Sequence, residues 1–527
     1  MTSGDYIVNI HLTPFPSFWE TISKDSMKKN KFFILFLSIA IFLVALFIYR
    51  DFYHDDAYIS LRYARNFLRG WGLVWNHGEK VEGYTNFFWI IIISFLSLLK
   101  VDLILASRIL GSIFSIALIS LLVFFSGKKN PISPFFLVTN GCFALWTLGG
   151  LETTTFSFFL TLAALVYMNK SANAKSAFIS GLILAFAALT RPEGLLFFLL
   201  FLMYMIYEGL TGKKSWRALV LDFSLGFVTI YLPYFIWRIS YYHFLFPNTF
   251  YAKGGINFFK FFSGMQYSLG FLLHFGFPCL IFLFAFRDGW QKDRKEILFF
   301  LFLIIPYFFY VTLMGGDHMP GYRFFVPILP LFYILIENVL SHISEFRSRS
   351  FASLFFILFL LINCLASYRY LPREKDPAAL AGQTVGIYIR EHWPSHTVIA
   401  SNNAGSLPYF SDRYCIDMLG LTDSVIAHRE IPQYELHWQF LGGHEKGDGK
   451  YILSRKPDYI ILGPADGRKD EPWFLSDKEI LEDPRFKKEY QYHEVRIKIE
   501  DEKIKRYNYN WLKNGILTFR YYRRQYE

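Results

Sequence analysis

The chain has 527 residues, of which 53% are hydrophobic and 20% aromatic, and its mean hydropathy is +0.28. Only 18% of the residues are charged, against about 25% in ordinary soluble domains. The formal net charge is +11, but the basic residues gather in short loops between apolar runs, as the positive-inside rule describes. The composition therefore excludes an ordinary soluble protein, and we expect membrane lipids and no nucleic acid as its surroundings.

Apolar runs separated by polar loops continue up to about residue 368. About 20 apolar residues cross the hydrocarbon core as a helix, so each run is a candidate span. Lysines before the first run indicate a cytoplasmic N-terminus. A C-terminal tail on the other side of the membrane requires an odd number of spans, so we expect about 11 of the twelve candidate runs to cross it. The candidates are 32–50, 86–103, 105–126, 133–148, 152–169, 176–189, 194–209, 218–240, 267–287, 296–313, 323–340 and 351–368.

Three parts of the chain follow from this pattern. Residues 1–31 are a polar leader that we expect in the cytoplasm, and 32–368 form a transmembrane domain. From 369 the pattern changes, because GQTVGIYIREHWP predicts a helix and HTVIASN and DYIILGP predict buried strands. We therefore expect an α/β domain over 369–527, outside the cytoplasm. The four cysteines form no CxxC or Cys/His cluster, so the sequence predicts no metal ligands among them.

The loop at 51–85, expected outside, carries the sharpest signal. Asp55 and Asp56 follow the first span, and AYISLRYARNFLRG after them has helical character. Seven residues make almost two helical turns, so Asp55 and Arg62 lie on the same face, roughly 10 Å apart along the axis. An acid and a guanidinium so placed could hold the two ends of an anionic sugar donor, with Arg62 or Arg65 on the phosphate.

Other interpretations of the acids stay open. An aspartate at a helix start is often an N-cap, although only one of two adjacent acids can cap. Asp55, Asp56 and Glu82 together leave a divalent metal open, and Glu82 is also a candidate substrate contact. Our hypothesis is that Asp55 is a general base and that Asp56 caps the helix or orients an arginine.

At this loop the sequence resembles a family of bacterial membrane glycosyltransferases of the GT-C type. That family includes the terminal arabinofuranosyltransferases of cell-wall arabinan synthesis. The resemblance begins with DDAYISLRYARNFLRGWGLVWNHGEKVEGYTNFFW and covers about 400 residues. It continues through GLETTTF, LTRPEG, FPNTFYAKGG, GGDHMPGYRFFVPILPL, IDMLGLTD and GHEKGDGKYIL, in this order.

The resemblance implies a polytopic helical membrane protein of the bacterial inner membrane with its active site outside the cytoplasm. It implies an inverting transferase that uses a polyprenyl-phosphate sugar donor, with a glycan or glycolipid of the cell envelope as acceptor. Its catalytic base would be an acid of the first external loop, which matches Asp55 or Asp56. Characterised relatives move arabinofuranose, but the family does not fix the sugar. No cofactor is implied.

The second external loop contains PNTFYAK, with Asn248, Tyr251 and Lys253. A lysine binds phosphate as a point charge, so Lys253 is a candidate donor contact and the other two are candidate substrate contacts. The alternative is a lysine whose stem lies along an aromatic belt while its charge reaches water.

The third external loop is GGDHMPGYR, with Asp317, His318 and Arg323. Its paired glycines allow a close backbone approach to a ligand. Arg323 is a candidate for the lipid phosphate, and Asp317 and His318 are candidate substrate contacts. An Asp317–Arg323 ion pair that stabilises the loop is an equal alternative.

Charges also stand at the ends of apolar segments, at Glu152, Arg191 and Glu193. Such groups are often functional, but a structural Arg–Glu pair explains them as well. Two other functions compete with a single-sugar transferase: a polymerase or ligase of lipid-linked saccharides, and a transporter or flippase. A transporter commonly has inverted repeats and charges at mid-membrane, whereas here the charges gather in outer loops and the sequence has no evident repeat.

Overall fold

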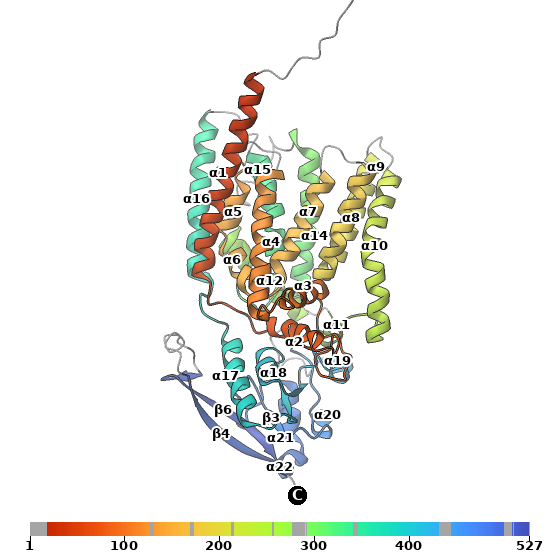
Figure 1. Ribbon diagram of the computed structural model, residues 1–527, viewed down its shortest axis with the longest axis vertical. Coiled ribbons are helices and arrows are strands. Elements are labelled where there is room, and N and C mark those ends of the chain that lie inside the picture. Colours follow the sequence, from red (N-terminus) through yellow and green to blue (C-terminus); the bar gives the residue numbers. More distant parts are fainter. Residues whose placement is uncertain are drawn as a thin grey trace, which may run out of the picture.

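The computed structural model describes residues 18–125, 131–168, 173–211, 216–255, 258–276, 290, 292–340, 346–431, 444–499, 509 and 511–525. A bundle of long helices forms one part, and a smaller domain with a β-sheet caps one end of it (Figure 1). The candidate span at 267–287 and the basic loops around 213–217 and 287–295 lie partly outside the described residues.

The bundle contains helices that are apolar on all sides. Large apolar side chains on their outer faces are exposed, among them Phe36 at 70% and Leu273 at 83%, as expected for a surface that meets lipid. The longer helices are α1 (Phe18–Ile48), α4 (Leu103–Phe125), α7 (Thr153–Met168), α8 (Ala174–Thr190), α9 (Glu193–Thr211), α10 (Trp216–Tyr242), α12 (Phe258–Phe275), α14 (Arg294–Leu313), α15 (Leu329–Leu340) and α16 (Phe346–Tyr370).

Five helices in the described part of the chain are long and apolar enough to cross a membrane. The bent pair α6 (Gly141–Leu148) and α7 adds a sixth if it is one span, and shorter apolar helices accompany them. The expected number of about 11 spans therefore stays a prediction.

Three short helices lie between the bundle and the smaller domain: α2 (Ala57–Leu68), α3 (Phe87–Ser97) and α11 (Asn248–Ala252) (Figure 1). The predicted loops meet at this end. The Asn248 N–H donates to the Glu82 carbonyl at 3.0 Å, which joins the second loop to the first. The rings of His54 and His318 lie 6.4 Å apart, which joins the first loop to the third.

Helix α2 starts at Ala57, so Asp55 precedes it and does not share a helical face with Arg62. That expectation was wrong, because the Asp55 N–H is bonded to the Asp376 carboxylate at 2.9 Å and not within a helix. Asp56 occupies the N-cap position, but its side chain makes no capping hydrogen bond.

The C-terminal domain has a mixed six-stranded sheet, and two of its strands lie in HTVIASN and DYIILGP, the segments that predicted buried strands. Its order is β2-β1-β3-β6-β4, with β5 paired to β6. The parallel strands are β1 (Val398–Ser401), β2 (Tyr414–Asp417) and β3 (Tyr459–Ile461). The antiparallel strands are β4 (Tyr490–Lys498), β5 (Leu512–Lys513) and β6 (Ile516–Arg524).

Helices cover this sheet. The longest, α17 (Pro377–His392), is the next helix after α16, and the side chains of Val385 and Ile389 on it and of Trp393 just after it are buried. The others are α18 (Ser406–Ser411), α19 (Ser424–His428), α20 (Gly449–Ser454), α21 (Leu475–Glu482) and α22 (Pro484–Glu489). Helix α18 packs against α2, so the first loop and the C-terminal domain form one junction.

Candidate functional site

A polar cluster at this junction brings together side chains from all three predicted loops. Asp56 is half-buried, and burial alone would raise the pKa of its carboxyl group. Neighbouring basic groups outweigh burial and lower that pKa: His54, His318, Arg323 and Lys253. Among the described residues, none donates a hydrogen bond to the Asp56 carboxylate. This aspartate therefore faces positive charge without a direct protein partner.

Lys253 directly follows α11, at its C-cap position, and has an accessible side chain. Burial of its surroundings and the nearby Arg323 lower the pKa of the Lys253 ammonium group, while Asp56 and Asp317 act in the opposite direction. No acceptor in the described part of the chain hydrogen-bonds its Nζ. The predicted phosphate contact thus lies close enough to Arg323 for the two charges to repel each other.

Arg323 is held on one side only. Its Nε donates to Asp317 Oδ2 at 2.8 Å, so the predicted loop ion pair exists. The guanidinium carbon lies 5.6 Å from the Trp146 ring centroid and 5.0 Å from that of Phe324. The terminal nitrogens have no hydrogen-bond partner among the described residues, so one edge of the fork remains open to a ligand.

Three histidines surround the cluster. The His318 ring lies 6.4 Å from that of His54 and 5.3 Å from that of His444, which belongs to the C-terminal domain. His54 also lies 3.7 Å from the Asp376 carboxylate. Within the described residues, no three His, Cys, Asp or Glu side chains are arranged to hold a metal ion.

Asp55 points into the C-terminal domain. Its carboxylate accepts the Ser406 N–H at 2.9 Å, the Asn403 amide at 3.0 Å and the Ser406 hydroxyl. Burial, together with the negative charge of Asp376, raises the pKa of Asp55 to about 6. A Cβ on Gly405 would overlap this carboxylate, so only a glycine allows α18 to approach so closely.

The two arginines of α2 bind protein atoms of the same junction. Arg62 donates to the carbonyls of Trp75 at 2.8 Å and Arg413 at 2.8 Å, and also to that of Pro408. Arg65 donates to the Tyr409 carbonyl and lies 3.1 Å from Asp412. The structure therefore does not bring these predicted phosphate contacts to the polar cluster.

Three further predicted substrate contacts also have protein partners. Glu82 forms a buried ion pair with Arg238 at 2.7 Å. The Asn248 amide donates to the carbonyls of Gly420 and Leu421, and the Tyr251 ring packs 4.1 Å from that of His428. These side chains attach loops of the membrane part to one another or to the C-terminal domain.

A buried triad lies next to the cluster. Arg191 donates to Glu152 at 2.8 Å and to Glu193 at 2.7 Å, and the Asn86 amide donates to Glu152 at 2.8 Å. The guanidinium carbons of Arg191 and Arg323 lie 5.1 and 5.0 Å from the centroid of the same ring, that of Phe324. The alternative of a structural Arg–Glu pair thus fits.

Sequence reasoning missed His54 and Trp146. His54 directly precedes the acid pair, a position that could have indicated it. Trp146 lies inside an apolar run and gave no signal, yet its indole N–H donates to the Pro320 carbonyl at 3.0 Å and its ring packs against Arg323. It holds the third loop in place.

Comparisons with known proteins bear on the fold. A family model described as "Domain of unknown function (DUF8728)" matches residues 373–512, and no curated protein matches the chain in sequence. The crystal structure of ArnT from Cupriavidus metallidurans bound to undecaprenyl phosphate is similar, with a TM-score of 0.52 and 12% identity over 77% of this chain and 91% of that chain. The apo state of the same protein gives 0.52 and 15%, over 76% and 90%.

The chain has a GT-C fold. The Archaeoglobus fulgidus oligosaccharyltransferase, in complex with Zn and sulfate, is a weaker neighbour, with a TM-score of 0.45 and 12% identity over 71% of this chain and 62% of that chain. The two ArnT structures alone, at these identities, establish the fold, the GT-C architecture of a multi-pass helical membrane protein. The chemistry has to be argued from the polar cluster.

Proposed function

We propose that the chain is a glycosyltransferase that moves a sugar from a polyprenyl-phosphate donor to a glycan or glycolipid acceptor. One observation carries the proposal. A carboxylate, Asp56, and two cations, Lys253 and Arg323, lie in one cluster at the end of the bundle. Among the described residues, the Asp56 carboxylate and the Lys253 ammonium group have no hydrogen-bond partner, and the Arg323 guanidinium is bonded through its Nε alone, to Asp317. This is the set of groups that a sugar phosphate and an attacking hydroxyl would require.

The cations would bind the donor phosphate. The open edge of the Arg323 fork offers two parallel N–H donors, and Lys253 adds a compact charge beside it. The GT-C neighbour ArnT was crystallised with undecaprenyl phosphate, a ligand of this class. As the bond between the anomeric carbon and the phosphate oxygen breaks, negative charge grows on the leaving phosphate, and preorganised cations stabilise it most at that moment.

Asp56 would be the general base. The acceptor hydroxyl loses its proton to Asp56 while its oxygen bonds to the anomeric carbon, from the side opposite to the leaving phosphate, so the configuration inverts. In the free protein the cations lower the pKa of Asp56. A bound phosphate neutralises much of that charge, so donor binding itself makes Asp56 a better base.

Asp55 would position the site and not touch the substrate. Its carboxylate already accepts bonds from Ser406 and Asn403, and it anchors the peptide that carries His54 and Asp56 to the C-terminal domain. This revises the hypothesis that Asp55 is the base. One observation still favours Asp55 as the general base: its pKa of about 6 makes it the stronger base of the two.

The sugar and the setting rest on the sequence resemblance. Arabinofuranose is the first sugar to test, and the bacterial inner membrane is the expected location, with the polar cluster and the C-terminal domain outside the cytoplasm. Single cysteines placed in 51–85 and in 369–527, labelled with an impermeant thiol reagent on intact cells, test this topology. Labelling only after the cytoplasm is opened would reverse it.

Transfer itself is tested with the purified full-length protein. Polyprenyl-phosphate arabinofuranose and other polyprenyl-phosphate sugars are supplied with envelope glycolipid extracts, and products are identified by mass spectrometry. The proposal expects a mass increase of one sugar residue on an acceptor, lost in Asp56→Asn. Movement of the donor across a bilayer without covalent transfer would contradict it.

A further inference from the structure

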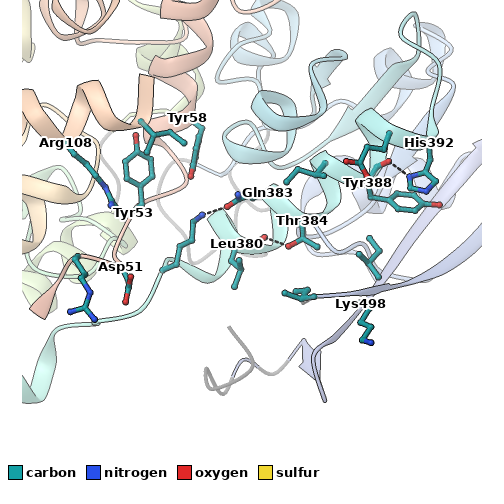
Figure 2. Close-up of a pocket in the computed structure, with 17 residues that line it drawn as sticks. Asp51, Tyr53, Tyr58, Arg108, Leu380, Gln383, Thr384, Tyr388, His392 and Lys498 are labelled. Carbon is teal, nitrogen blue, oxygen red and sulfur yellow. Dashed lines mark hydrogen bonds between the residues drawn. The ribbon is translucent and has the colours of Figure 1, made fainter. Parts of the chain in front are cut away.

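A separate groove lies where the bundle meets α17 and β4 (Figure 2). Its volume is about 690 Å³, within the range of ligand pockets in proteins. One wall comes from the ends of α1 and α4, with Arg50, Tyr53 and Arg108, and the other from α17 and β4. Asp56, Lys253 and Arg323 do not line it, so the groove is a different place from the polar cluster.

The groove is long because one face of α17 forms it. The lining positions of this helix recur every three or four residues, as one helical face requires: Leu380, Gln383, Thr384, Ile387, Tyr388 and Glu391. From the first to the last they extend roughly 16 Å at the rise of an α-helix. The groove begins at Arg50, just after α1 ends, and continues away from the bundle to His392. An elongated ligand fits such a shape better than a single compact group.

The charges of the lining favour an anion. Four cationic side chains face two carboxylates: Arg50, Arg108, Lys375 and Lys498 against Asp51 and Glu391. Arg108 donates to the Phe52 carbonyl at 3.0 Å through one terminal nitrogen. Its Nε is buried and has no hydrogen-bond partner in the described part of the chain. A carboxylate or phosphate in the groove would meet a partly satisfied guanidinium there.

Aromatic rings alternate with hydrogen-bonding groups along the groove. Tyr53 and Tyr58, both buried, close its inner end, with ring centroids 5.0 Å apart, and the partly exposed Tyr388 lies farther along beside Thr384 (Figure 2). Gln383 accepts a hydrogen bond from Lys375, and the Thr384 hydroxyl donates to the Leu380 carbonyl at 2.9 Å. The accessible part of Tyr388 beside these polar groups suits a sugar ring, because each sugar ring has an apolar face and a polar edge.

We propose that this groove binds an extended anionic saccharide, and that this saccharide is the acceptor of the transferase. The second clause rests on the proposed function. The position supports it, because Tyr53 and Tyr58 stand on either side of Asp55 and Asp56 in the chain. A saccharide that lies along α17 therefore has its inner end at the segment that carries the two acids.

The binding test uses the full-length protein in nanodiscs of neutral lipid. The probes are a fluorescent oligogalacturonate, which carries one carboxylate per ring, and a neutral maltooligosaccharide of the same length. The proposal expects the anionic probe to bind more tightly. Lys498→Glu, which reverses an exposed charge of the groove, should weaken its binding about tenfold, and Tyr388→Ala should weaken both probes.

The matched control is Lys487→Glu in α22, which makes the same charge change at the far end of the C-terminal domain (Figure 1). It should bind the anionic probe like the unaltered protein. Equal weakening by the two lysine variants, or no weakening by Lys498→Glu and Tyr388→Ala, would overturn the proposal. Loss of probe binding on adding anionic phospholipid to the nanodisc, with no loss on adding the same amount of neutral phospholipid, would assign the groove to lipid headgroups instead.

A second measurement separates this inference from the proposed function. Lys253→Ala should keep oligogalacturonate binding, because Lys253 does not line the groove. Saccharide binding without any sugar transfer would support the groove as a saccharide site and contradict the proposed transferase function. Transfer in which Lys498→Glu leaves the acceptor KM unchanged would keep the transferase and remove the groove as its acceptor site.

Discussion

Two sets of charged side chains at the same junction differ in their partners. Arg238 and Glu82 form a buried ion pair, both less than 5% exposed. Asp56, Lys253 and Arg323 lie together, yet within the described ranges the one direct contact of the three with another charge is that of Arg323 Nε with Asp317. Both sets carry charges that are costly to remove from water.

This contrast indicates where a ligand binds. A buried charge with a bonded partner is already stabilised, and replacing one partner mainly damages the fold. Asp56 and Lys253, which have no hydrogen-bond partner among the described residues, and the open edge of Arg323 remain able to bind a ligand. At this junction, whether a charged side chain already has a bonded partner therefore indicates its role better than its charge alone does. Each of the following predictions tests that distinction.

The largest effect is expected at Asp56. Asp56→Asn keeps the shape of the side chain but removes its basicity, so transfer should fall about 10²–10⁴-fold while donor binding survives. The measurement is the transfer rate of the purified variant, with donor binding determined separately. Asp55→Asn is the companion variant, and its rate should fall less. A fully active Asp56→Asn beside an inactive Asp55→Asn would return the base to Asp55.

A smaller effect is expected at the phosphate contacts. Hydrogen bonds to charged groups contribute about 1.5–3 kcal/mol, so Arg323→Ala should weaken donor use about tenfold to a hundredfold. Arg323→Lys should recover only part of it, because an ammonium cannot form the paired contact. Donor KM and kcat of the two variants and of Lys253→Ala test this. Normal donor kinetics in all three would remove the cations from the site.

The pH profile distinguishes the two aspartates. The acidic limb of kcat/KM reports the base of the free enzyme. If Asp56 is that base, its lowered pKa puts the limb below the ordinary aspartate range, and kcat/KM stays flat through pH 6. If Asp55 is the base, kcat/KM falls as the pH drops through about 6. Rates between pH 4.5 and 8, with stability checked at each pH, decide between them.

The smallest effect on chemistry is expected at the buried pair. Arg238→Gln leaves Glu82 without its ionic partner, so stability should fall by about 3–5 kcal/mol. The thermal midpoint should drop. The kcat of the folded fraction should stay within about threefold of normal, because the molecules that remain folded retain the polar cluster. Thermal unfolding in detergent and active-site-normalised rates test this. A large loss of kcat without a loss of stability would place the pair in the mechanism.

Parts of the site were visible in the sequence and parts were not. Lys253, Asp317, His318 and Arg323 were selected from loop motifs, and the structure brings them together with Asp56. Arg62, Arg65, Glu82, Asn248 and Tyr251 were selected by the same reasoning, yet all have protein partners. A polar side chain in a segment expected outside the membrane was common to both groups, so sequence alone could not separate them.

The sequence predicted the helical membrane architecture, the C-terminal α/β domain and the loops that carry polar side chains. These features follow from hydropathy and periodicity, which are local patterns of neighbouring residues. Which charges are paired, and the different directions of Asp55 and Asp56, depend on tertiary contacts. The partner that holds Asp55 is Ser406, 351 positions away, and it turns one carboxylate into the C-terminal domain while its neighbour faces the cations. Contacts at such a separation leave no local pattern in the chain, since they arise only when the domain docks on the bundle.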